Sequence, residues 1–93
     1  MAVGIVRIDL SFDYVRSLKE KRSILEPLLA RLRTENNVSV NELEGQNDPQ
    51  HSTVGIAYIA NDGKACNRKL SKIAESIENS RNFRVNNYSL EVF

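Results

Sequence analysis

Two groups of basic side chains have the residue types and spacing best suited to a chemical task. Lys19, Lys21 and Arg22 fall at the start of a helical pattern. Lys64, Arg68 and Lys72 recur every four residues, so they share one face of a helix, and no acid lies between them. Cations arranged in this way are able to bind the phosphates of a nucleic-acid backbone. The plainer alternative for both groups is a solvated helix face.

The other reactive side chains are isolated. His51 stands beside Ser52 and Asp48 in a polar loop, where nothing holds a nucleophile, a base and an orienting group in one geometry. Cys66 falls on an apolar helical stripe, which indicates a buried core thiol. No Cys/His pair has zinc-ligand spacing and no glycine-rich loop precedes a helix. We therefore expect no catalytic residue, no metal site and no cofactor.

Arg7 and Asp9 lie two residues apart on one face of the first strand pattern, together with Val3 and Ile5. An arginine at the centre of a sheet is able to bind a phosphate or the carboxylate of a partner. The plainer interpretation pairs Arg7 with Asp9 on a solvated face. Because aliphatic side chains are unfavourable on such a face, we predict a self-association surface that includes Val3, Ile5 and Arg7.

Length and composition predict one globular domain over residues 1–93. Hydrophobic residues make up 41% and charged residues 27% of the chain, and the net charge is +1, so an electrostatic argument must rest on local patches. The single cysteine excludes an internal disulfide and fits a reducing compartment. No apolar run approaches the roughly 20 residues needed to span a bilayer, and residues 1–10 do not have the pattern of a signal peptide. We expect a cytoplasmic protein without a membrane partner.

The elements that position these residues follow from the hydrophobic period. Residues 2–12 alternate as a strand whose even-numbered face is buried. A leucine-rich helix follows and ends near Asn36, but its start is ambiguous because two capping boxes occur, Ser17 with Glu20 and Ser23 with Glu26. Pro27 favours either a kinked helix from Ser17 or a main helix that begins near Ile24 with the proline in its first turn.

The rest of the chain continues the alternation of elements. We expect a strand over 38–44, a polar loop over 45–51, a central strand over 53–60, a helix from Asn61 or Asp62 to about residue 78, and a last strand over 83–93. The order predicts an α+β fold of ferredoxin-like βαββαβ type. Its four-stranded antiparallel sheet has the order 4-1-3-2, with both helices on one face and the other face open.

Several segments resemble the YlxP-like bacterial family, known as domain of unknown function 503. The resemblance rests on the run from Ser17 to Ser23 (SLKEKRS), Arg31-Leu-Arg33, Val38-Ser-Val40 with Glu42, the loop from Gln46 to Gln50, and Asn61-Asp62. It implies a ferredoxin-like fold. The role of the family is not established, but its genes often lie near those for ribosome maturation and translation factors. In this chain Pro49 stands where relatives usually carry a tryptophan, and His51 stands where they carry a basic residue.

Three functional hypotheses follow. The first is a non-enzymatic module that contacts RNA or a ribosomal assembly through Lys19, Lys21 and Arg22, extended by Lys64, Arg68 and Lys72. The second is a structural protein that forms a homodimer through its open sheet face. The third, which the residues support least, is an acylphosphatase-like enzyme using Arg16. The phosphate-cradling glycine-rich loop that this chemistry needs is replaced here by residues 11–15.

Overall fold

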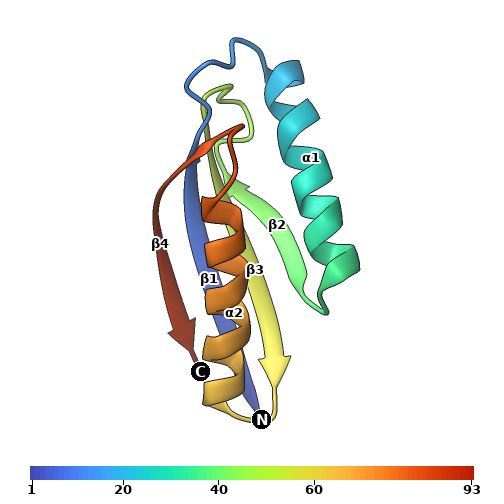
Figure 1. The fold of residues 1–93 in the computed structure, drawn as a ribbon, viewed down its shortest axis with the longest axis vertical. Helices are drawn as coiled ribbons and strands as arrows, with labels where there is room; N and C mark the ends of the chain where they lie inside the picture. Colours follow the sequence, from blue (N-terminus) through green and yellow to red (C-terminus); the bar gives the residue numbers. More distant parts are fainter.

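A computed structural model describes all residues from 1 to 93 and shows the predicted βαββαβ order. The elements run up and down the long axis of the molecule (Figure 1). Their bounds are β1 Ala2–Ser11, α1 Leu18–Glu35, β2 Ser39–Glu44, β3 His51–Ala60, α2 Gly63–Glu78 and β4 Arg84–Val92.

The four strands form one antiparallel sheet in the order β2-β3-β1-β4. This is the predicted order 4-1-3-2 read from the opposite edge, so the expected α+β ferredoxin-like topology is confirmed. The central strand β1 pairs with β3 along its whole length, from Ala2 opposite Ala60 to Ser11 opposite His51. Strands β2 and β4 form the two edges of the sheet.

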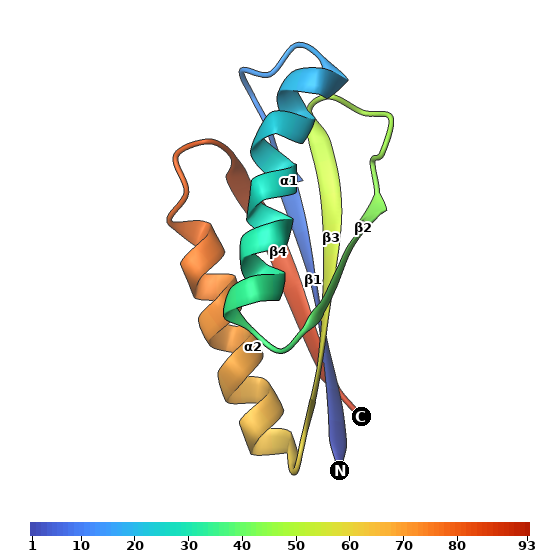
Figure 2. The same ribbon diagram turned by 90° about the vertical axis from the view of Figure 1, so that its right-hand side faces the viewer.

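Both helices cover the same face of the sheet and run in opposite directions (Figure 2). The even-numbered side chains of β1 point into the core between the layers, as the alternation predicted. Val6, Ile8 and Leu10 are at most 1% exposed. They pack with the apolar stripes of the helices and with Val54 and Ile56 of β3. The opposite face of the sheet carries no helix.

Helix α1 begins at Leu18, because the first capping box is the one that caps it. The Ser17 hydroxyl accepts a hydrogen bond from the Glu20 amide over 3.1 Å. Ser23 lies inside the helix, where its hydroxyl donates to the Glu20 carbonyl. The alternative start near Ile24 is therefore wrong, and the helix continues through Pro27 to Glu35. Burial of its leucine face stabilises the helix in spite of the proline.

Each edge strand contains a bulge. The register of β2 against β3 shifts between Glu42 and Glu44, and that of β4 against β1 shifts opposite Asp9 and Leu10. The extra residues are Leu43 and Asn86, and both lie on the open face of the sheet. Neither α1 nor α2 combines the length and the hydropathy that a membrane-spanning helix needs.

Candidate functional site

Helix α2 presents the second basic group to solvent. Asp62 caps the helix by accepting a hydrogen bond from the Ala65 amide. The apolar stripe that begins with Cys66 and Leu70 is buried against the sheet. The helix therefore turns Lys64, Arg68 and Lys72 outward, and all three are exposed. The prediction that they share one face is confirmed.

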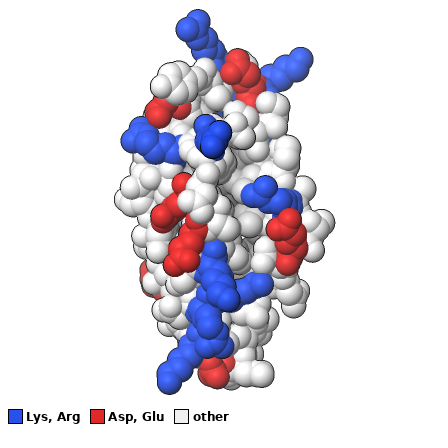
Figure 3. Space-filling view, in the orientation of Figure 1, with Lys and Arg blue, Asp and Glu red and all other residues white.

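Two further cations extend this group across the helix layer. A groove between the helices is lined by Arg31 of α1 and by Lys69 and Lys72 of α2. The five residues that make up this helix-layer basic patch are Arg31, Lys64, Arg68, Lys69 and Lys72. None of them forms an ion pair within the chain. Blue side chains accordingly gather in one column over the lower half of the molecule, where α2 begins (Figure 3).

Acidic residues bound the patch. Glu35 lines the groove beside Arg31, and Glu75 and Glu78 occupy the last turns of α2. A positive surface therefore covers the first half of α2, and an acidic segment follows it. Sequence reasoning missed Lys69, which lies between two members of the predicted stripe. It also missed Arg31, which joins the patch only through the packing of α1 beside α2.

Lys21 does not contribute to any exposed surface. Its side chain is 1% exposed, and its Nζ donates hydrogen bonds to Glu42 Oε2 at 3.1 Å and to the carbonyls of Gly45 and His51. These three oxygens come from the two ends of the loop between β2 and β3. Burial therefore removes Lys21 from the expected nucleic-acid contacts and makes it a structural anchor for that loop.

The other members of the first basic group, Lys19 and Arg22, are exposed. They lie where α1 begins, at the end of the molecule opposite the one where α2 begins (Figures 1 and 2). The molecule is 42 Å long. The two predicted basic groups thus occupy opposite ends of the helix layer and do not form one surface.

The polar residues of the open face have partners other than those expected. Arg7 does not pair with Asp9 but donates to Glu44 over 3.1 Å, and both side chains of this pair are at least half exposed. Asp9 accepts a hydrogen bond from the Thr53 hydroxyl at 2.8 Å. The register explains the difference: Arg7 lies opposite Gly55, which has no side chain, and reaches across β3 to Glu44 of β2, whereas Asp9 lies directly opposite Thr53.

Aliphatic side chains surround Arg7 on the open face. Val3 is half-buried, whereas Ile5 is 38%, Ile59 is 56% and Leu43 is 42% exposed. Ile59 lies beside Val3 because the register places Gly55, Ala57 and Ile59 on this side of β3, one of the two arrangements that the sequence allowed. Leu43 lies over Gly55, where an added Cβ would meet its side chain at 2.6 Å. The alternation of β2 puts Leu43 on this face together with Ser39 and Asn41, and the bulge adds Glu44 to the same face.

The remaining candidate residues lie apart from these two surfaces. His51 Nδ1 lies 3.2 Å from Asp48 Oδ2. The pKa of Asp48 is lowered, first by the hydrogen bond from the Gln50 amide and then by His51. Arg16 is exposed in the loop between β1 and α1. Cys66 is buried as expected, with its thiol donating to the Ala2 carbonyl at 3.5 Å.

Comparison with known proteins gives a family and a fold. The profile of the family described as "Protein of unknown function (DUF503)" matches residues 3–90. The chain is 32% identical over 62 residues to "Uncharacterized protein YlxP" of Bacillus subtilis (strain 168), a match that covers 67% of each chain. The fold resembles that of the solved "De novo designed protein Foldit4", with a TM-score of 0.50, 18% identity and 99% and 94% of the two chains covered.

Proposed function

This chain belongs to the DUF503 family, and we propose that it is a non-enzymatic module that binds RNA through the helix-layer basic patch. The observation that carries the proposal is the convergence of five exposed or partly exposed cations from two helices without an internal ion-pair partner. Unpaired cations retain their full attraction for an external anion, because no carboxylate of the protein must be displaced first.

The spacing of the patch favours an extended polyanion over a single small anion. Lys64, Arg68 and Lys72 follow one another at intervals of about 6 Å along the helix axis. A row of this kind contacts successive phosphates of a strand, and the groove beside it brings in Arg31 and Lys69. No aromatic side chain lines either of the grooves that the patch cations form, which favours contact with the backbone over stacking on bases.

Salt dependence tests the proposal. We expect the affinity for a labelled RNA hairpin, measured by fluorescence anisotropy, to fall as salt is raised from low to moderate concentration. If all five cations contact phosphates, the slope of log K against log [salt] is about −3.5 to −4.5. An affinity that does not change with salt would refute contact with the backbone.

Matched charge variants locate the binding surface. The double variant Arg68→Gln/Lys72→Gln should weaken binding at least about tenfold and reduce the steepness of the salt slope by about two. The control Lys19→Gln/Arg22→Gln removes the same charge at the opposite end of the molecule, and its affinity should stay within about twofold of the original. Equal losses in the two variants would show that the patch is not the binding site.

A second candidate function is self-association through the open sheet face. The observation that favours it is the aliphatic cluster of Val3, Ile5, Leu43 and Ile59 around the Arg7–Glu44 pair, with no helix over it. Packing of two such faces would form a four-layer dimer. A dimer formed through this face would be lost in sedimentation experiments when Ile59 is replaced by lysine, and a wild-type chain that stays monomeric at micromolar concentration would exclude it.

A further inference from the structure

Strand β4 leaves one edge of the sheet free. Its residues pair with β1 on one side only. Val3 and Phe93 exchange two backbone hydrogen bonds, of 2.8 and 3.1 Å. Bonded and non-bonded pairs alternate in an antiparallel ladder. From Asn87 onward, the amides and carbonyls of the odd-numbered residues therefore point toward β1, and those of Tyr88, Leu90 and Val92 point outward.

This edge lacks the protection that sheet edges usually carry. Charged residues, prolines and bulges along an edge discourage pairing with another strand. Strand β2 is six residues long and has a bulge and two glutamates. In β4 the charges stand near its ends, at Arg84 and Glu91, and the bulge precedes Asn87. The outer ladder positions from Tyr88 to Val92 are therefore open to a partner strand.

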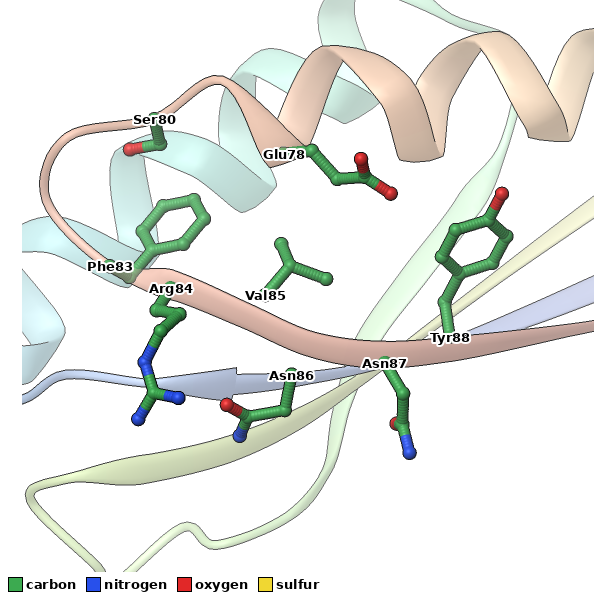
Figure 4. A pocket seen from close by; sticks show the side chains of 8 residues that line it. All are labelled: Glu78, Ser80, Phe83, Arg84, Val85, Asn86, Asn87 and Tyr88. Carbon is green, nitrogen blue, oxygen red and sulfur yellow. The ribbon is translucent and has the colours of Figure 1, made fainter.

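Exposed apolar groups accompany the free backbone groups on the helix side of this edge. Tyr88 is 41% and Val92 is 39% exposed. A groove runs between β4 and the end of α2, and Phe83, Val85 and Tyr88 turn toward the helix whereas Asn86 and Asn87 turn away from it (Figure 4). A strand added at this edge would bring apolar side chains against Tyr88 and Val92.

The charges of α2 show which strand this edge fits. Lys64 and Arg68 line a groove with Val92, at the end of β4. Glu78 lines the groove with Val85 and Tyr88, toward the start of β4. None of these charged side chains has an ion-pair partner in its own chain. Beside β4, then, α2 is basic at one end and acidic at the other.

We propose that β4 pairs with β4 of a second copy of this chain, in antiparallel orientation. A two-fold axis perpendicular to the sheet reverses the second copy, so the basic end of each α2 lies beside the acidic end of the other. Charge complementarity thus selects a second copy of this chain as the partner of β4, with Lys64 facing Glu78 of the other copy. Both helix layers remain on one side of an eight-stranded sheet.

The outward backbone groups restrict the register. Facing residues of paired strands point to the same side of the sheet. The two-fold axis must therefore pass between the two copies of one residue, which then faces itself. With the axis at Ser89, Tyr88 of each copy exchanges backbone hydrogen bonds with Leu90 of the other, and Asn87 faces Glu91. This register also places Val92 opposite the Asn86 bulge, which brings Lys64 toward Glu78 of the other copy.

Two lysine variants test the surface by analytical ultracentrifugation. The wild-type chain should sediment as a dimer, and Tyr88→Lys should convert it to a monomer because a charge then enters the edge. Ile59→Lys, on the open face, should leave the dimer intact. Circular dichroism and thermal melting confirm that each variant is folded. A monomeric wild type at several hundred micromolar, or a dimer that Ile59→Lys disrupts and Tyr88→Lys does not, overturns the proposal.

A charge reversal tests the pairing of Lys64 with Glu78 of the other copy. Lys64→Glu and Glu78→Lys should each raise the dimer dissociation constant about five- to tenfold, since each affects two symmetric contacts. The double variant Lys64→Glu/Glu78→Lys should restore the affinity of the wild type. Losses that add in the double variant would overturn the proposed orientation, and neither result depends on RNA binding.

Cross-linking tests the register. Ser89 faces itself in a non-bonded pair, whose Cα atoms lie about 4.5 Å apart, within the range that a disulfide spans. Ser89→Cys should therefore form covalent dimers under mild oxidation, whereas Asn41→Cys on the opposite edge strand should not. The buried Cys66 does not interfere. Equal cross-linking of the two variants, or none in Ser89→Cys, overturns the register.

Discussion

Lys21 shows how one residue can satisfy two patterns at once. It belongs to a basic run, and it also lies four residues before Leu25 and seven before Leu28, which places it on the apolar stripe of α1. In the structure the second pattern prevails, and the ammonium group is buried among three oxygens. The helical period was thus a signal in the sequence that this lysine faces inward.

Replacement of Lys21 should reveal this structural role. In Lys21→Met, Glu42 keeps its hydrogen bond from Ser52 but loses its cation, and the Gly45 and His51 carbonyls lose a donor. We expect the free energy of unfolding to fall by about 2–4 kcal/mol in urea denaturation. The exposed Lys19→Met should change it by less than about 0.5 kcal/mol. Equal effects of the two replacements would contradict the anchoring role.

Gly45 is the other residue whose role is visible only in the structure. Its φ of +85° lies in the left-handed region, and an added Cβ would lie 2.7 Å from the His51 carbonyl oxygen. The Lys21 anchor bonds to the carbonyls of both Gly45 and His51, so the loop closes tightly. The polar composition of residues 45–51 predicted a loop, but this closure depends on a helix that lies elsewhere in the chain.

At the scale of elements, α1 contains an unfavourable residue that tertiary packing offsets. Pro27 is exposed at a mid-helix position and removes the hydrogen bond that would reach the Ser23 carbonyl. The buried leucines Leu25, Leu28, Leu29 and Leu32 keep the helix continuous. The sequence left two helix starts open because local rules describe the cost of the proline but not the burial that compensates it.

Removal of the proline should stabilise the protein. We expect Pro27→Ala to raise the free energy of unfolding by about 1–3 kcal/mol, since a backbone hydrogen bond and helix propensity are regained. Ala30→Gly is a suitable control at another exposed position of the same helix, and it should lower the stability by about 1 kcal/mol. An unchanged or lower stability of Pro27→Ala would indicate that the proline fits its site.

At the scale of the whole molecule, an ion pair joins the first loop to the last strand. Arg84 donates two hydrogen bonds to the Asp13 carboxylate, at 3.1 and 3.2 Å. These bonds lower the pKa of Asp13 below its usual value of 3.8 and raise that of Arg84. The pair is exposed and spans 71 positions of the sequence, so nothing in the local pattern indicated it.

The lowered pKa of Asp13 predicts a pH dependence with a defined sign. The folded state binds the Asp13 proton more weakly than the unfolded state, so the contribution is complete at neutral pH and is lost as the pH falls below 3.8. We expect Asp13→Asn to melt at a lower temperature than the wild type at neutral pH. The difference should vanish in acid, and a difference that is independent of pH would rule out this linkage.

The sequence alone was sufficient for the architecture. Strand and helix periods depend on neighbouring residues, so the buried face of β1, the stripe of α2 and the order of the elements could all be predicted. The sequence could not predict which cations share a surface, because Arg31 comes to line one groove with Lys69 and Lys72 only when the two helices pack together. Nor could the sequence predict the Arg7–Glu44 pair, because only the bulge after Glu42 brings Glu44 to the open face. Local periodicity determines the elements, whereas contacts between distant segments decide which side chains remain available to a partner.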